Sequence, residues 1–363
     1  MDIDIDDIKG LKRILEADIK KSSNVFIIGH NSPDFDSIGS CIGLSMIAKT
    51  FKKPTYIIVN DEDAKIEPGV KKIIDDNKED FNIIKNNEFL NKKNNNSLLI
   101  VTDVNKDYMV SVKDYLEDIN NIIVIDHHMK DEKTIKNSKK FINLNSSSAC
   151  EIVTRLLGYF KIKYSTEIAN YLLAGISLDT KRFKHNTTAK THDVAEKLID
   201  HGADIDYVNK LFLEEFESYC KISNLIINGT TIKKYSENLL SPIQVSFTLN
   251  RNQPKAIYLK EDYAKAADRM MKFNGIDAAF TLGYVDEKTI HISARSGKRV
   301  DVGKIMEEVY GGGNAQNAGG RVESDNIFEI EEELMNKVYL GISDKEDIID
   351  EPPVIKIKQI KRK

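Results

Sequence analysis

Up to about residue 200, the chain alternates short apolar runs rich in β-branched residues with longer segments of mixed polarity. The short runs predict strands and the longer segments predict helices. Alternation of this kind is typical of βαβ units, in which right-handed helical crossovers join parallel strands. We expect strands over residues 25–28, 56–59, 98–102 and 122–125, and helices over residues 38–51, 70–76, 107–118, 148–160, 166–179 and 190–201.

A different pattern begins near Pro242, after a helical stretch that starts at residue 205 and continues to about residue 225. Here strands are expected over residues 243–249, 276–282 and 289–294, helices over residues 262–273, 302–309 and 330–339, and a glycine-rich loop over residues 311–320. Residues 86–96 are rich in Asn and Lys and are expected to form a surface loop.

These patterns predict an α/β protein with two domains. A parallel-sheet domain is expected over residues 1–205, a helical linker over 206–235, a smaller α+β domain over 236–342 and a mobile tail over 343–363. The length of 363 residues is comfortable for two domains of this size.

Composition and charge exclude several classes of protein. Basic residues (53) and acidic residues (57) nearly balance, giving −4, whereas a dedicated binder of long nucleic acids would show a basic face. No run reaches the 18 apolar residues of a membrane span, and the first residues are acidic where a signal peptide is basic. The three cysteines show no zinc-site spacing and indicate reduced thiols in a cytoplasmic protein.

The stretch from residue 24 to residue 40 carries the first candidate chemistry. An apolar run ends at Gly29, and His30, Asp34 and Asp36 follow it. Pro33 disfavours helix here, so we expect these residues to lie on a loop. Ser37 is the expected N-cap of the next helix. One imidazole and two carboxylates at the carboxyl end of a strand can hold a metal ion, although a polar turn would look the same.

Further acidic residues and histidines follow other apolar segments. Asp103 follows the strand at 98–102, Asp126, His127 and His128 follow the strand at 122–125, and Asp179 ends the apolar segment that begins at residue 172. Parallel strands point the same way, so side chains at their carboxyl ends should meet at one edge of the sheet. Singly, Asp103 could cap a helix and the two histidines could be ordinary hydrogen-bonded residues; jointly, they indicate a metal site.

The types of ligand restrict the metal. Two imidazoles among carboxylates suit Mn²⁺ better than Mg²⁺, which prefers oxygen ligands and keeps its waters. The absence of cysteine ligands argues against a structural zinc site. Clustered carboxylates repel one another without a cation, so metal binding should also stabilise the fold.

The order of these motifs resembles that of the DHH phosphoesterase superfamily. The segments Ser293-Ala-Arg295 and Gly311-Gly-Gly-Asn-Ala-Gln-Asn-Ala-Gly-Gly320 are similar to the DHH-associated domain that many members carry. The resemblance spans roughly residues 20–340 and is strongest to the catalytic part of cyclic-di-AMP phosphodiesterases. Those enzymes usually add membrane helices and sensor domains upstream, which this sequence lacks, so regulation through such parts is not carried over.

The resemblance implies two divalent ions, and Mn²⁺ is the expected metal. The leaving group would be the ribose 3′-oxygen of the substrate. The two ions would share a hydroxide nucleophile. Asp126 would orient a histidine, and His128 would face the substrate phosphate. The implied ligands are His30, Asp34 and Asp103 for one ion and Asp36, Asp103, His127 and Asp179 for the other, so that Asp103 bridges them.

The DHH-associated part would bind the substrate. Arg295 would contact a phosphate or base, and the consecutive glycines Gly311, Gly312 and Gly313 would let backbone N–H groups approach a phosphate. Asn314 stands where the family usually has a histidine, so phosphate affinity or substrate choice should differ from the family norm. A turn before a helix is the simpler interpretation of the glycines.

Several functions share these features. The first choice is a phosphodiesterase acting on cyclic dinucleotides, with cyclic di-AMP preferred. A nanoRNase-like enzyme that degrades short oligonucleotides or dephosphorylates 3′-phosphoadenosine 5′-phosphate would use the same metal ligands, and a dinucleotide-binding sensor with weak turnover is the alternative of another class. A RecJ-like exonuclease and a manganese pyrophosphatase are disfavoured, because the sequence has no basic groove signal and does have the glycine-rich segment. A homodimer is left open.

Overall fold

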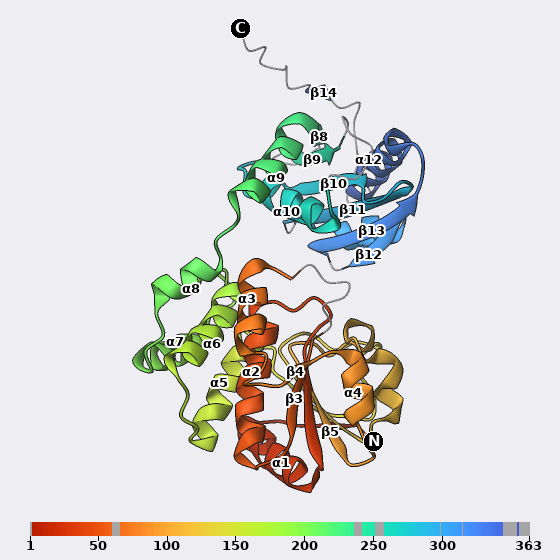
Figure 1. Ribbon diagram of the computed structural model, residues 1–363. Coiled ribbons are helices and arrows are strands. Elements are labelled where there is room, and N and C mark those ends of the chain that lie inside the picture. The colour runs from red at the N-terminus through yellow and green to blue at the C-terminus, as the bar shows by residue number, and fades with distance from the viewer. Residues whose placement is uncertain are drawn as a thin grey trace. The chain divides into compact units, whose positions relative to one another are not determined.

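The computed structural model describes residues 2–59, 66–235, 242–250, 258–297, 299–313, 315–343 and 354–355. The chain divides into two compact units, Met1–Leu213 (unit 1) and Glu214–Lys363 (unit 2), which are described separately (Figure 1). Asn314 lies outside the described residues, as does the expected mobile tail except for Ser343 and the short strand β14. The boundaries expected for the domains and the linker remain predictions.

Unit 1 is built on a parallel sheet of seven strands in the order β1-β7-β6-β5-β2-β3-β4. All of its strand pairs are parallel, which confirms the fold class predicted for this half of the chain. The strands are β1 (Ile3–Asp4), β2 (Asn24–Ile28), β3 (Thr55–Ile58), β4 (Ile83–Ile84), β5 (Ser97–Thr102), β6 (Asn121–Asp126) and β7 (Lys139–Ile142).

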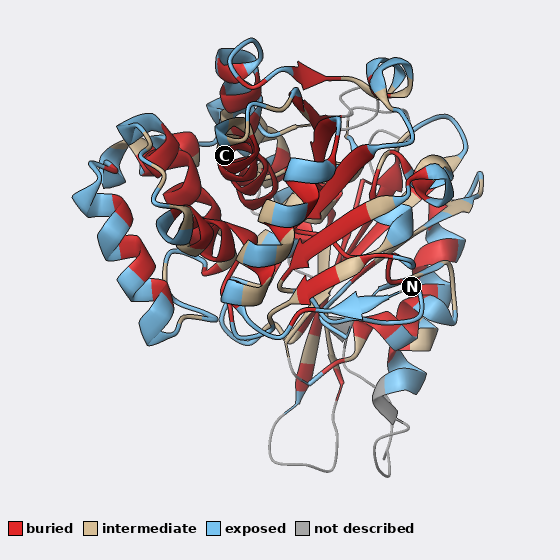
Figure 2. Cartoon of the chain, turned by 90° about the horizontal axis from the view of Figure 1, so that it is seen from below, coloured by how far each residue is buried: buried red, intermediate tan, exposed pale blue. Residues whose placement is uncertain are grey.

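Helices cover both faces of this sheet because successive strand residues alternate between two apolar clusters. Ile27, Ile100 and Ile123 belong to the cluster on one face, and Phe26, Leu99 and Val124 belong to the cluster on the other. The central strands are buried throughout, whereas β1 at the edge is exposed (Figure 2). The helices of unit 1 are α1 (Ile8–Lys21), α2 (Phe35–Thr50), α3 (Pro68–Asn77), α4 (Asn86–Lys92), α5 (Ala149–Phe160), α6 (Thr166–Asp179), α7 (Ala189–Asp200) and α8 (Ile205–Leu211).

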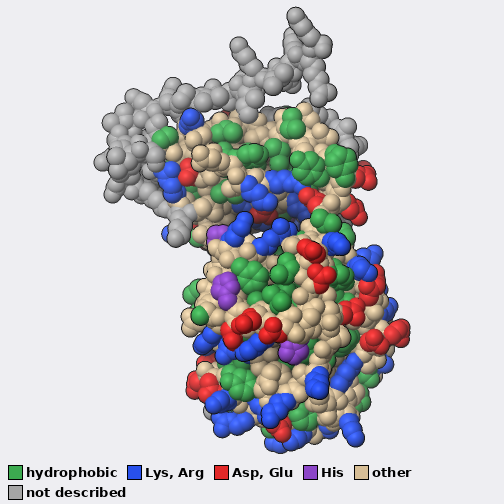
Figure 3. Space-filling view, turned by 90° about the vertical axis from the view of Figure 1, so that its left-hand side faces the viewer, with side chains coloured by type: hydrophobic (Ala, Val, Ile, Leu, Met, Phe, Trp, Pro, Cys, Tyr) green, Lys and Arg blue, Asp and Glu red, His purple; other side chains and the backbone are tan. Residues whose placement is uncertain are grey.

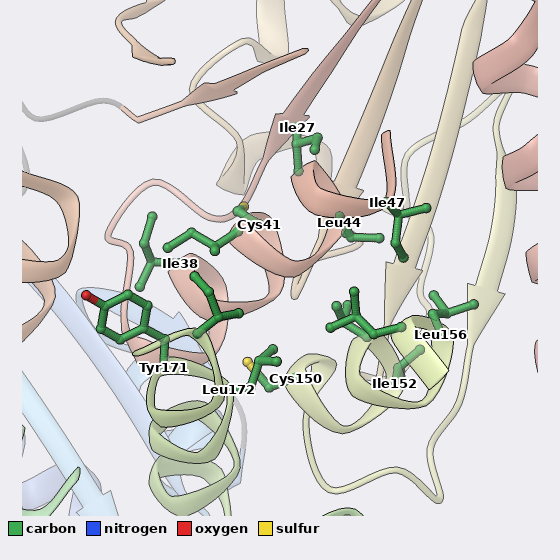
Figure 4. Packing of buried hydrophobic residues seen from close by; sticks show 14 of the residues in the cluster. Ile27, Ile38, Cys41, Leu44, Ile47, Cys150, Ile152, Leu156, Tyr171 and Leu172 are labelled. Atoms are coloured by element: carbon green, nitrogen blue, oxygen red, sulfur yellow. The ribbon is translucent and has the colours of Figure 1, made fainter. Parts of the chain in front are cut away.

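Helix α2 lies at the centre of the larger apolar cluster. Figure 4 shows Cys41 and Leu44 of α2 between Ile27 of the sheet and residues of α5 and α6, including Cys150 and Leu172. Helix α2 is buried nearly all round, because it packs against the sheet on one side and against two helices on the other. This packing fixes the start of α2, where two of the candidate metal ligands lie.

Three local predictions for unit 1 are wrong. Residues 86–96 are not a loop throughout: they include helix α4, which buries Phe89 against the sheet. Residues 107–118 form two 3₁₀ helices, η1 (Asp107–Met109) and η2 (Lys113–Asp118), instead of one α-helix. The N-cap of α2 is Asp34 instead of Ser37, because the Asp34 carboxylate accepts the backbone N–H groups of Asp36 and Ser37.

Unit 2 contains a second sheet in the order β12-β13-β11-β10-β9-β8-β14. Among the strands that the structure describes in this sheet, only β9 and β10 pair in parallel and the other pairs are antiparallel, so the smaller α+β domain is confirmed. The strands are β8 (Thr230–Tyr235), β9 (Ile243–Leu249), β10 (Ala278–Tyr284), β11 (Thr289–Ser296), β12 (Gly311–Gly313), β13 (Asn317–Glu323) and β14 (Val354–Ile355), and the helices are α9 (Phe216–Gly229), α10 (Lys260–Met270), α11 (Val302–Glu307) and α12 (Ile327–Ser343).

The glycine-rich segment of unit 2 is not a loop. Gly311–Gly313 form β12, which pairs antiparallel with β13. A Cβ atom on Gly311 would lie 2.0 Å from the backbone oxygen of Gly319, and one on Gly313 would lie 2.4 Å from that of Asn317. The close approach of the two strands therefore accounts for glycine at both positions.

No helix among the described residues is long and apolar enough to span a bilayer. On the face shown in Figure 3, Lys and Arg side chains are interspersed with Asp and Glu over unit 1.

Candidate metal centre

The candidate ligands of unit 1 come from the carboxyl edge of its sheet and from the helices beside it. His30 follows β2 after Gly29, Asp103 follows β5 directly, and His127 follows β6 directly. Asp103 has a left-handed backbone conformation, with φ of 60°, which aspartate tolerates better than most residues. The parallel register of β2, β5 and β6 therefore brings the three side chains to one edge, as the sequence indicates.

Helix α5 holds the carboxylate of Asp36 in position. Asp36 lies in the first turn of α2 and is completely buried. Its two oxygens accept the backbone N–H groups of Ala149 (2.7 Å) and Cys150 (2.8 Å). These N–H groups lie in the first turn of α5 and therefore have no hydrogen-bond partner within the helix. The helix dipole also favours a negative charge at this end.

Asp34 and Asp179 complete the set from two helix ends. Asp34 uses one oxygen to cap α2, and its other oxygen lies 3.5 Å from Nε2 of His30. Asp179 is the last residue of α6, and its Oδ2 lies 3.0 Å from Nε2 of His127.

The two oxygens of Asp103 face two different groups of side chains. Oδ2 lies 3.4 Å from Nε2 of His30, and Oδ1 lies 3.4 Å from Nε2 of His127. One ligand atom from each of His30, Asp34 and Asp103 lies within 4.8 Å of the others, and the same holds for Asp36, Asp103, His127 and Asp179. These are the two groups that the resemblance implied, and Asp103 belongs to both.

The side chain of His127 fits a bound cation. Its Nε2 atom is buried and makes no hydrogen bond among the described residues, although three carboxylates surround it at 3.0–3.8 Å. A buried nitrogen without a hydrogen-bond partner is costly unless another group satisfies it. Nitrogen and carboxylate donors converging on one point are suited to a divalent cation such as Mn²⁺.

The pKa values show how strongly this cluster attracts positive charge. Burial alone would lower the pKa of His127, but the carboxylates of Asp103 and Asp179 raise it to about 11. Burial and the neighbouring charges of Asp103 and Asp179 raise the pKa of Asp36 well above its usual range. Burial opposes ionisation of Asp103 as well, but His127 and His30 outweigh it and lower its pKa. Protons therefore compensate the carboxylates where a cation would otherwise do so.

Asp126 and His128 form a hydrogen-bonded pair beside these two groups, and a ligand atom of each lies within 4.8 Å of those of Asp103 and His127. Oδ1 of buried Asp126 lies 2.8 Å from Nδ1 of His128 and also accepts the N–H of His127. The side chain of His128 is 56% exposed. The hydrogen bond to Asp126 raises the pKa of His128, despite its partial burial.

The sequence interpretation missed Asn105 and the first turn of α5. Nδ2 of Asn105 donates to Oδ2 of Asp126 (2.6 Å) and to the backbone oxygen of His128 (3.0 Å). Asn105 is 1% exposed, so it holds Asp126 from inside the protein. An Asn two residues after a candidate ligand is the only sequence signal for this role, whereas the contact of α5 with Asp36 spans 113 residues and leaves no local signal.

The residues expected to bind substrate lie in unit 2. Arg295 is on β11, and its Nε donates to Oδ1 of Asp268 (2.8 Å). Gly311, Gly312 and Gly313 form the edge strand β12. Their roles in substrate binding, like those of the candidate metal ligands, remain proposals.

Comparisons with known proteins agree with this arrangement. The DHH family N-terminal domain matches residues 24–176, and the DHHA1 domain matches residues 245–339. The chain is 31% identical over 335 residues to the cyclic-di-AMP phosphodiesterase PdeA of Listeria monocytogenes and 32% identical over 335 residues to the cyclic-di-AMP phosphodiesterase GdpP of Bacillus subtilis. In both cases the match covers 90% of this chain and 49% of the relative, so the chain spans about half the length of these relatives.

A solved structure shows the same fold. The crystal structure of an exopolyphosphatase-related protein from Bacteroides fragilis has a TM-score of 0.69 and 22% sequence identity, and the match covers 92% of this chain and 97% of that one. With a DHH domain followed by a DHHA1 domain, and with the motifs of both on the elements described above, this chain belongs to the DHH family.

Proposed function

We propose that this protein is a manganese-dependent phosphodiesterase that hydrolyses cyclic dinucleotides, cyclic di-AMP in preference, to linear dinucleotides with a 5′-phosphate. The observation that carries the proposal is Asp103, whose two oxygens face two separate groups of nitrogen and carboxylate donors. That is the arrangement expected of a carboxylate that bridges two cations. The choice of substrate follows from the relatives PdeA and GdpP, which are cyclic-di-AMP phosphodiesterases.

In this proposal the two groups of side chains hold two divalent cations. His30, Asp34 and Asp103 would bind one, and Asp36, Asp103, His127 and Asp179 would bind the other. When bound, such a pair supplies Lewis acidity and a hydroxide nucleophile at neutral pH.

The remaining residues would bind and orient the substrate. His128, held by Asp126, would present its other ring nitrogen to a phosphate oxygen, and its exposure makes it accessible. Arg295 and the N–H groups of Gly311, Gly312 and Gly313 would contact the substrate from unit 2, together with Asn314, which lies outside the described residues. We assign catalysis to residues 1–205, linkage to residues 206–235 and substrate binding to residues 236–342.

The proposal includes a location in the cytoplasm. All three cysteines are free, and Cys41 and Cys150 are buried, which suits a reducing compartment. Long nucleic acids are not proposed as substrates, because the net charge of the chain is −4 and basic and acidic side chains are interspersed on the face of unit 1 that Figure 3 shows.

The test is a manganese-dependent assay on cyclic di-AMP, linear pApA and 3′-phosphoadenosine 5′-phosphate, with Asp103→Asn as the matched inactive variant. We expect cyclic di-AMP to be opened fastest and Asp103→Asn to lose activity on all three. Faster turnover of pApA or of 3′-phosphoadenosine 5′-phosphate would support the nanoRNase-like alternative. Binding of cyclic di-AMP without hydrolysis by the wild-type protein would support a sensor.

A further inference from the structure

Unit 1 contains a hollow between α5 and α7 that shares no residue with the candidate metal centre. Its volume is about 500 Å³, within the range of small-molecule sites. Buried Thr154 and Val194 form part of its lining, together with Arg155, Gly158, Tyr159, Lys190, Asp193 and Lys197. Along α5, Thr154 and Tyr159 lie roughly 8 and 15 Å from Ala149, whose N–H group holds Asp36.

The charges that line the hollow are predominantly positive. Arg155, Lys190 and Lys197 face a single carboxylate, that of Asp193, which pairs with Lys197 at 2.7 Å. Arg155 and Lys190 make no hydrogen bond or ion pair with any residue that the structure describes. Arg155 is half-buried, and Lys190 is exposed. Two unpaired cations at one hollow are suited to a dianion such as a phosphate monoester.

Part of the lining, one helical turn from Arg155 on α5, has room for a ring. Tyr159 is 41% exposed and stacks on no other aromatic side chain in the described part of the chain. A Cβ atom on neighbouring Gly158 would meet nothing within 4 Å, so the missing side chain leaves open space beside the tyrosine. An exposed aromatic ring next to open space can stack with a planar ligand.

We propose that this hollow binds a small phosphorylated ligand with a planar ring, of the size and charge of a nucleoside monophosphate. Arg155 and Lys190 would bind the phosphate, and Tyr159 would stack on the ring above Gly158. This site is separate from the substrate site proposed above and does not depend on the proposed function.

The test is calorimetric titration of the full chain with AMP, in parallel with adenosine alone and inorganic phosphate alone. We expect AMP to bind more tightly than either fragment. The double variant Arg155→Gln/Lys190→Gln should weaken AMP binding at least about tenfold, because each charged hydrogen bond contributes on that order. Gly158→Phe should also weaken it, by filling the open space without removing a charge.

One control separates this site from other anion-binding surfaces. Lys71→Gln/Lys163→Gln removes two exposed lysines elsewhere on unit 1 and should leave AMP binding unchanged. Melting curves of the variants would show that they are folded. The proposal is overturned if wild-type protein does not bind AMP at millimolar concentration, if Arg155→Gln/Lys190→Gln binds as the wild type does, or if Lys71→Gln/Lys163→Gln weakens binding by as much.

Discussion

At the scale of single residues, several side chains of the candidate metal centre are held in place by other side chains. Asp34 both caps α2 and faces His30, and Asp126 joins the N–H of His127 to the ring of His128. Asn105 in turn holds Asp126. These candidate functional groups therefore have fixed partners, as a precise site requires.

Replacing Asn105 tests this support. Asn105→Ala should lower kcat/KM about 10- to 100-fold, the usual cost of losing a residue that orients a metal-site histidine or its carboxylate. The cause is that Asp126 loses a hydrogen bond and no longer fixes His128. The measurement is steady-state kinetics of the manganese-loaded protein.

Asn120→Ala is the matched control, because Asn120 is exposed and donates to the backbone oxygen of Asn95. It should retain wild-type activity. If Asn105→Ala did so too, the position of Asp126 would not depend on Asn105.

His291 of β11 gives a pH dependence of stability that is separate from the metal centre. Burial, followed by the positive charges of Arg321, Lys260 and Arg295, lowers its pKa to about 4. Between pH 6.5 and 4 the unfolded chain takes up a proton at this ring and the folded chain does not. The folded state therefore loses stability as the pH falls through this range, and loses nothing from this group above it.

The matched variant is His291→Gln, which cannot titrate. We expect the wild type to lose about 1 kcal/mol more than the variant between pH 7.5 and 5, after allowance for the exposed part of the ring. Urea unfolding of both proteins with chelator present measures the difference. Equal losses would mean that His291 is not held neutral in the folded state.

At the scale of elements, close packing of α2, α5 and α6 positions Asp36. A Cβ atom on Gly175 of α6 would lie 2.5 Å from Sγ of Cys150 and 2.9 Å from Oδ1 of Asp36. Gly175→Ala should therefore push α6 away from α2 and α5, destabilise the fold by about 1–3 kcal/mol and weaken Mn²⁺ binding. Thermal melting and metal titration measure the two effects.

Gly158→Ala provides the opposite case on α5, because its Cβ would meet open space. This change should be neutral or should stabilise the helix by up to about 1 kcal/mol, since alanine favours a helix over glycine. If Gly175→Ala behaved like Gly158→Ala, the helices would not be packed as closely as described.

The elements also show how far the sequence alone determines this fold. Strands β2, β5 and β6 and the residues that follow them could be predicted because apolar runs end in polar residues at one sheet edge. Helix α4 could not, since its Asn- and Lys-rich sequence forms a helix by burying Phe89 against the sheet. The β12–β13 pair could not be predicted for a similar reason. A glycine-rich sequence indicates a loop, and these glycines form a strand because β13 pairs with them. The contact of α5 with Asp36 is purely tertiary.

At the scale of the whole molecule, each unit has its own apolar core, so a ligand can raise the free energy of unfolding of one unit without raising that of the other. The larger clusters of unit 1 contain residues of β2, α2 and α6, and the main cluster of unit 2 contains residues of β9, β10 and α12. The candidate metal ligands all belong to unit 1. Binding of a cation should therefore stabilise unit 1 and leave unit 2 nearly unchanged.

Removing the metal tests this difference. In chelator, four clustered carboxylates lose the cations that offset their repulsion, so the melting temperature of the full chain should fall. Backbone hydrogen exchange should accelerate at the start of α2, at the end of α6 and in the first turn of α5, whereas β9 and β10 should keep their protection. The measurement is hydrogen exchange by mass spectrometry on the manganese-loaded and chelated protein. An unchanged melting curve would count against the metal centre, and equal loss of protection in β9 and β10 would mean that the two units unfold together.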